Sequence, residues 1–294
     1  MSLLAQKREE PSLAFGGQAL IEGVMMRSRT HVVMCIRQPD NEILTHTEEV
    51  NSLSERHKAL GLPFLRGIIA LFETLYLGVK SLFFSANAAL EEEEEKFTYR
   101  EWALVVALTL ALSSFFFVVP FLLTNFLHLT GVLFNVVEAV VRLAMFLLYL
   151  TSVAMWGEFR RILQYHGAEH KAINAYEARA ALEVADVKKF SRLHRRCGTS
   201  FIFIVMLVSI LLFSIMPSRG FAARLGYRVL LIPVIGAISY ELLKLSARYR
   251  DSMITRTLTA PGLAFQRLTT REPDDDMIEV AIKAVEEMDR LSGS

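Results

Sequence analysis

Residues 102–127 form an apolar segment that contains no Asp, Glu, Lys or Arg. A stretch of about 20 apolar residues is long enough to cross the roughly 30 Å hydrocarbon core of a bilayer as a helix. The composition agrees, since 53% of the 294 residues are hydrophobic, against roughly 45–50% in soluble domains. The sequence therefore predicts a mainly α-helical integral membrane protein.

A second apolar segment, residues 132–156, follows after a short break. It carries Glu138 and Arg142 four residues apart, on the same helical side as Asn135 and Tyr149. Because a charged side chain inside a bilayer is costly without a partner, this polar stripe is expected to face protein and not lipid. Two interpretations of Glu138 and Arg142 stay open: a self-neutralising structural pair, and a role in transport or catalysis.

Two shorter apolar segments, residues 201–216 and 229–243, are bounded or interrupted by prolines. They predict two spans or a re-entrant hairpin, which gives a bundle of about four membrane segments. A further stretch, residues 60–84, carries charges at intervals of seven on one helical face, and predicts an amphipathic helix on the membrane surface or packed against the bundle. Those charges are Arg66, Glu73 and Lys80.

Basic residues concentrate in the loop of residues 157–200. By the positive-inside rule this loop is cytoplasmic, and four spans then place both termini in the cytoplasm. Arg219, Arg224 and Arg228 in an outer loop run against this arrangement. We expect a multi-pass protein in contact with the lipid bilayer. The sequence leaves open whether the chain binds another protein or forms a homo-oligomer. No nucleic-acid partner is expected.

The two ends of the chain are not membrane-like. Residues 31–37 and 43–50 are strand-like runs joined by good turn chemistry, and they predict a β-hairpin. Gly16-Gly17-Gln18 is expected to form a tight turn before residues 19–26. Residues 274–276 can cap a C-terminal helix with an apolar stripe. The stripe comprises Ile278, Ala281, Ile282, Val285 and Met288.

The chain has two cysteines, Cys35 and Cys197, far apart in the sequence, which favours a reducing, cytoplasmic setting. The sequence thus divides into six parts. The parts are a cytoplasmic β-rich segment (1–58), an amphipathic membrane-surface helix with an acidic linker (59–100), two transmembrane helices (101–156), a basic cytoplasmic region with helices (157–200), two short membrane segments or a re-entrant hairpin (201–245), and a cytoplasmic tail with an amphipathic helix (246–294).

The candidate chemistry begins at His166, Glu169 and His170, just after the second apolar segment. Histidines at i and i+4 point the same way on a helix, so both can bind one cation. The string fits the His-x-x-Glu-His pattern of one class of zinc peptidases. Glu169 is the candidate general base, because it lies one turn from His166 and can orient or deprotonate a water on the metal.

Further candidate ligands lie beyond this string. Glu177 lies on the same helical side as the histidine pair, and His194 and Cys197 offer a second ligand pair. Four protein ligands would make a closed structural zinc site, whereas three would leave a position open for chemistry. Cys197 is alternatively a nucleophile with His194 or His170 as its base. Glu241 is a further ligand candidate, with a salt bridge to an arginine as the alternative.

Several strings resemble those of the YqhQ-like family of bacterial membrane proteins, and they occur in the same order. They are residues 16–27, 166–171, 194–201, 240–241, 261–262 and 269–273. The family's His-Pro-Arg-Cys-Gly-Thr-Ser-Phe string has Arg195 in place of proline here, while His194 and Cys197 are kept. The resemblance implies the bacterial inner membrane and, from the family's label as a predicted metal-dependent enzyme, a metal but no particular substrate.

Two functions follow from these observations. The first is a membrane-embedded, zinc-dependent enzyme, plausibly a hydrolase, with a cytoplasm-facing site and a peptide or lipid substrate. The second is a non-enzymatic scaffold, transporter component or partner of a cytoplasmic complex, in which the same residues bind a structural metal or one another.

Overall fold

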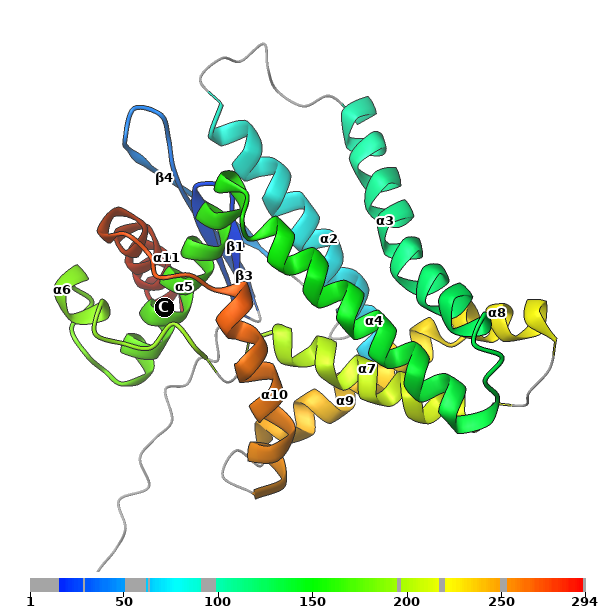
Figure 1. Cartoon of the computed structure of the whole chain (residues 1–294). Coiled ribbons are helices and arrows are strands. Elements are labelled where there is room, and N and C mark those ends of the chain that lie inside the picture. The colour runs from blue at the N-terminus through cyan, green and yellow to red at the C-terminus, as the bar shows by residue number, and fades with distance from the viewer. Residues whose placement is uncertain are drawn as a thin grey trace, which may run out of the picture.

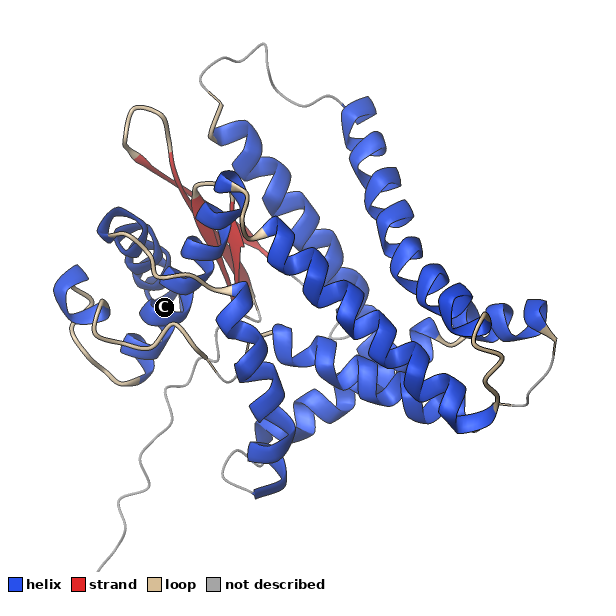
Figure 2. Ribbon diagram, viewed as in Figure 1, coloured by secondary structure: helices blue, strands red, loops and turns tan. Residues whose placement is uncertain are grey.

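A computed structural model describes residues 16–28, 30–50, 62, 64–90, 99–194, 197–216, 220–248 and 253–292. The described chain folds into one antiparallel sheet with helices packed on it and a bundle of further helices beside it (Figure 1). Helix is the predominant structure, and the strands gather in a single small region (Figure 2). The mainly helical fold class predicted from the sequence is therefore confirmed. The acidic run of residues 91–95 and Arg219 lie outside the described residues.

The N-terminal region is a four-stranded sheet and not only a hairpin. The predicted hairpin is confirmed as its third and fourth strands, but Gly16-Gly17-Gln18 belong to the first strand and do not form a turn. Two five-residue strands, one of them glycine-rich, show too little alternation of apolar and polar residues to be recognised in a sequence. The strands, in spatial order, are β1 (Gly16–Leu20), β2 (Gly23–Arg27), β3 (His31–Arg37) and β4 (Ile43–Glu49), each antiparallel to its neighbour.

Helices cover both faces of this sheet. On one face, α5 (Gly157–Glu177), α6 (Val184–Val187) and α11 (Asp275–Ser292) enclose a core with alternate residues of β2 and β3. The other face packs against the C-terminal half of α2 (Leu65–Ala88). The predicted amphipathic C-terminal helix is confirmed as α11, whose apolar stripe is buried. Segments that are far apart in the sequence thus form one domain.

The remaining helices form the bundle, in which α4 (Gly131–Val153) packs on α3 (Tyr99–Asn125) and α7 (Thr199–Ser214), and α7 packs on α9 (Ile232–Arg248) and α10 (Met253–Thr269). The helix α10 lies in the region expected to be a cytoplasmic tail, and it packs on α7 of the bundle. The bundle also contains α8 (Phe221–Leu230).

Among the described residues, α2 and α4 are long and apolar enough to cross a membrane. The helices α8 and α9, bent by 43° at their junction, count as a third if they form one broken span, and α7 is apolar but shorter. The first predicted span, residues 102–127, forms the continuous helix α3. Two or three helices of the described chain are thus suited to span a membrane, which indicates membrane association, whereas the number of four membrane segments stays a prediction.

The charges of α2 are directed into the protein. This helix packs on α9 with its N-terminal half and on the sheet with its C-terminal half, as Figure 1 shows. Of the two placements predicted for it, packing against the bundle is the one observed. Three ion pairs with α9, β2 and β4 hold it there: Arg66 with Glu241 (2.5 Å), Glu73 with Arg27 (3.5 Å) and Lys80 with Glu48 (2.5 Å).

Candidate metal centre

Helix α5 brings two imidazoles together, and the segment before α7 adds a thiol. His166 and His170 are one turn apart, with ring centroids 4.4 Å from each other. The Nε2 atom of His166 lies 3.2 Å from the Sγ atom of Cys197. One ligand atom from each of the three residues lies within 4.8 Å of the other two. These are the ligand types that zinc prefers.

Hydrogen bonds fix the proton positions on both rings. The Nδ1 atom of His166 lies 2.7 Å from the Thr269 carbonyl oxygen, and Nδ1 of His170 lies 2.7 Å from the Arg192 carbonyl oxygen. A carbonyl oxygen only accepts, so each Nδ1 carries a hydrogen, and in the neutral ring each Nε2 then keeps a lone pair. Metal-ligating histidines are oriented in this way. Burial also lowers the pKa of His170 and so favours the neutral form that binds metals.

Glu169 lies beside the three ligands as a buried carboxyl group. It is 4% exposed, and its Oε2 atom has no hydrogen-bond partner among the described residues. Burial raises the pKa of Glu169 to about 6, while the neighbouring His166 and His194 act in the opposite direction. A carboxyl group with this pKa is suited to accept and return a proton near neutral pH.

Gly17 of β1 makes room for this carboxyl group. A Cβ atom at residue 17 would lie 2.3 Å from Oε1 of Glu169, a distance that real Cβ contacts do not show. A larger residue at position 17 would therefore displace the Glu169 carboxyl group from its observed position, and this role of the glycine was missed in the sequence. The signal was present, because Gly17 lies in one of the strings that resemble the YqhQ-like family.

Two polar side chains position the loops that complete the centre. Lys171 donates hydrogen bonds to the carbonyl oxygens of Lys188 and Phe190, at 2.8 and 2.9 Å, and so holds the loop that presents Arg192 to His170. Gln266 of α10 binds the backbone of His194 at both its N–H (2.8 Å) and its carbonyl oxygen (2.7 Å). Sequence reasoning did not identify Gln266, because nothing near it in the chain marks its partner.

The other predicted ligands are placed differently. His194 is buried, with its ring centroid 5.7 Å from that of His170, and its Nε2 atom lies 3.5 Å from Oε1 of Glu177. These two residues pair with each other beside the three-ligand group and are not members of it. Glu241 forms a bidentate ion pair with Arg66, at 2.7 and 2.5 Å. The salt bridge weighed as its alternative is therefore the one observed, and the closed set of four ligands is not assembled.

These features define a class: mainly helical proteins with apolar helices long enough to span a membrane, a small antiparallel sheet and a His-His-Cys cluster in which His170 is buried. The chain matches the family described as "Protein of unknown function (DUF1385)" over residues 62–290, and it belongs to that family. It is 36% identical to the "Uncharacterized protein YqhQ" of Bacillus subtilis (strain 168), over 95% of this chain and 93% of the relative. The resemblance to the YqhQ-like family is thus confirmed. No solved structure matches the chain.

Proposed function

We propose that the protein is a zinc-dependent hydrolase of the membrane, with His166, His170 and Cys197 as the metal ligands. The observation that carries this proposal is the pair of Nδ1–H groups bound to backbone carbonyls, which leaves both Nε2 atoms beside the thiol. Three protein ligands are the number found in catalytic zinc sites, where zinc acts as a Lewis acid that activates a hydrolytic water.

Glu169 is the proposed general base. Its carboxyl group is buried next to Gly17, and the neighbouring His166 and His194 act to lower its pKa, which places it near the ligands. With a pKa of about 6, it is mostly ionised at neutral pH and can take a proton from the attacking water and return it to the leaving group.

The proposed substrate reaches the centre from the apolar side. A cavity of about 650 Å³ lies among α2, α3, α4, α7, α9 and α10, and its lining is mostly hydrophobic. The lining of this cavity includes Phe201, which is four residues after Cys197. It also includes Leu268, which directly precedes Thr269, the residue whose carbonyl oxygen binds His166. A cavity of this size and polarity suits a lipid or an apolar peptide.

The proposed orientation places the sheet, α5, α11 and both termini in the cytoplasm, with about four spans in the bacterial inner membrane. The basic residues of α5 and of the loop after it support this orientation. They lie in the domain built on the sheet, at one end of the bundle (Figure 1).

One contact favours a second candidate, a thiol hydrolase without metal. The 3.2 Å distance from Cys197 Sγ to His166 Nε2 is that of a nucleophile and its base, and the Thr269 carbonyl would orient the base. The two candidates use the same atoms and differ in whether a metal is bound.

Metal content separates the two candidates. The protein is purified in detergent without a metal-affinity tag, supplied with zinc, dialysed and measured by elemental mass spectrometry. We expect about one zinc per chain in the wild type and in Glu169→Gln, and loss of zinc in His166→Ala/His170→Ala. Cys35→Ser is the matched cysteine control and is expected to keep the metal. A wild type that retains no zinc would overturn the metalloenzyme and leave the thiol hydrolase.

A further inference from the structure

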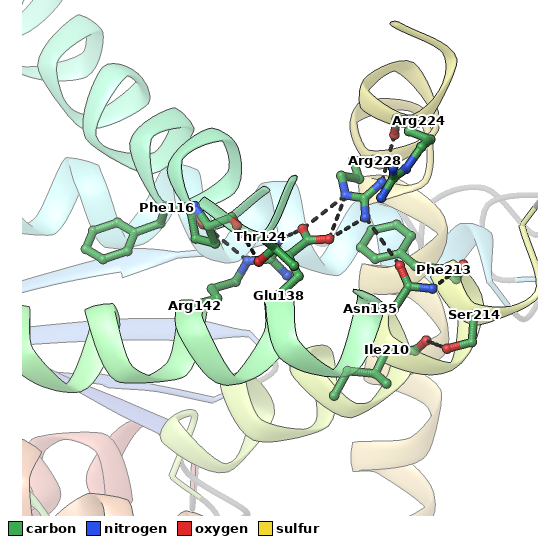
Figure 3. A network of polar contacts seen from close by, with 11 residues as sticks. Phe116, Thr124, Asn135, Glu138, Arg142, Ile210, Phe213, Ser214, Arg224 and Arg228 are labelled. Carbon is green, nitrogen blue, oxygen red and sulfur yellow. Dashed lines mark hydrogen bonds and ion pairs between the residues drawn. The ribbon is translucent and has the colours of Figure 1, made fainter. Parts of the chain in front are cut away.

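Glu138 of α4 binds two arginines inside the bundle, at the end remote from the sheet (Figure 3). Its carboxylate is 1% exposed and accepts from Arg142 at 2.6 Å. Arg228 of α8 donates to both of its oxygens, with Nε at 3.0 and 3.1 Å. The Glu138–Arg142 pair considered from the sequence is thus present, and Arg228 adds a second guanidinium to the same carboxylate, so the three side chains carry excess positive charge.

Arg224 adds a third guanidinium one helical turn away. Its Cζ atom lies 3.7 Å from the ring centroid of Phe134. No acceptor among the described residues hydrogen-bonds this guanidinium, whereas Arg228 is also bound by the Asn135 side chain and the Arg224 carbonyl. The group therefore holds three positive charges and one negative charge. Arg228 is buried (5% exposed), and excess positive charge around a buried guanidinium is costly unless a counter-ion is present.

A pocket of about 80 Å³ opens beside these arginines, and Arg224, Tyr227 and Arg228 line it together with Asn135. Thr130 and Gly131 at the start of α4 also line it, and Phe213, Ser214 and Met216 form the rest of the lining. The N-terminus of α4 has no side-chain cap and no acidic residue in its first turn, so its amide dipoles add positive potential to that of the arginines. The volume exceeds what a single water needs.

We infer that this pocket binds the phosphate group of an anionic ligand, either a lipid headgroup or free phosphate. Guanidinium groups bind phosphate oxygens with two parallel hydrogen bonds, and helix N-termini bind the same anion. Glu138 is the positioning residue, because it holds Arg228 at the pocket. The site is separate from the metal centre, since α8 and α5 lie at opposite ends of α4, a helix of 23 residues (Figure 1).

The test uses the full chain in a neutral detergent and follows thermal unfolding during titration. The added compounds are phosphatidylglycerol, the matching diacylglycerol without phosphate, and inorganic phosphate at constant ionic strength. We expect phosphatidylglycerol, inorganic phosphate or both to raise Tm, and diacylglycerol to have no effect. A response to the lipid alone identifies a headgroup, and a response to inorganic phosphate identifies the free anion.

Arg224→Gln is the diagnostic variant, because it removes a guanidinium that does not hold Glu138. Loss of charge-assisted hydrogen bonds is expected to raise the half-saturating concentration about tenfold or more. Arg160→Gln, at an exposed position of α5, removes the same charge at the other end of α4 and is expected to leave binding unchanged. An unchanged midpoint in Arg224→Gln, or no response of the wild type to either phosphate compound, would overturn the proposal.

Discussion

Gly167 is expected to be the glycine of α5 that tolerates substitution least. A Cβ atom there would lie 2.0 Å from the Arg271 carbonyl oxygen, whereas real Cβ contacts essentially never fall below 3.0 Å. The carbonyl would have to move by about 1 Å, and it belongs to a segment held on α5 by the Arg271 N–H bond to the Leu163 carbonyl oxygen (2.8 Å). Thr269, whose carbonyl orients His166, lies in the same segment.

Two terms set the magnitude of Gly167→Ala. Alanine in a helix interior is favoured over glycine by about 1 kcal/mol. Overpacking costs typically 1–3 kcal/mol, and the upper end applies because the obstacle is backbone and not a flexible side chain. The net expectation is a destabilisation of about 1–2 kcal/mol, or a Tm lowered by roughly 2–8 °C. Displacement of the Thr269 carbonyl should also weaken zinc binding about 10- to 100-fold.

The assay compares Gly167→Ala with Gly157→Ala, a substitution in the same helix at a position where a Cβ atom meets nothing within 4 Å. Thermal unfolding gives the stability, and titration with a chelator of known zinc affinity gives the metal affinity. If Gly167→Ala matched Gly157→Ala in Tm and retained zinc as the wild type does, the close packing of residues 269–271 on α5 would be refuted.

Three further predictions concern charge and thiol chemistry. The pKa of Glu169 is raised from 4.5 to about 6 in the folded protein, so protonation favours the folded state, and the charged carboxylate lowers the stability by about 2 kcal/mol above pH 6. In metal-free protein, Glu169→Gln should therefore raise Tm at pH 8, and this gain should vanish near pH 4.5. A gain in Tm that persists near pH 4.5 would contradict the assignment. Maleimide labelling followed by mass spectrometry should modify Cys197 and not Cys35, because burial raises the pKa of the Cys35 thiol to about 11. Bound zinc should protect Cys197 from the label. Equal labelling of both cysteines would be inconsistent with the burial of Cys35. Glu241→Gln should leave zinc content unchanged, because Glu241 pairs with Arg66, and zinc loss in that variant would place Glu241 at the metal.

The parts of the site that lie within one helix could be predicted from the sequence. His166 and His170 are one turn apart in any helix that contains both, so their proximity follows from helical geometry alone. Periodicity likewise predicts the stripe on α11, and strand-like runs joined by good turn chemistry predict the hairpin of β3 and β4.

Contacts between distant segments could not be predicted in this way. Glu241 and Arg66 are 175 positions apart, and Arg228 and Glu138 are 90 apart. A pattern of charges gives no information about which distant partner a side chain will find. The same holds for Gly17, whose close approach to Glu169 exists only because β1 lies against α5. Chain topology decides these pairings.

X-ray absorption at the zinc edge is the most direct test of the three-ligand centre. The account predicts one sulfur at about 2.3 Å, with the remaining donors nitrogen or oxygen at about 2.0–2.1 Å. The sulfur contribution should disappear in Cys197→Ser and persist in Cys35→Ser. A spectrum with two or more sulfur donors, with none, or without a change in Cys197→Ser would contradict the assignment of His166, His170 and Cys197 as the metal site.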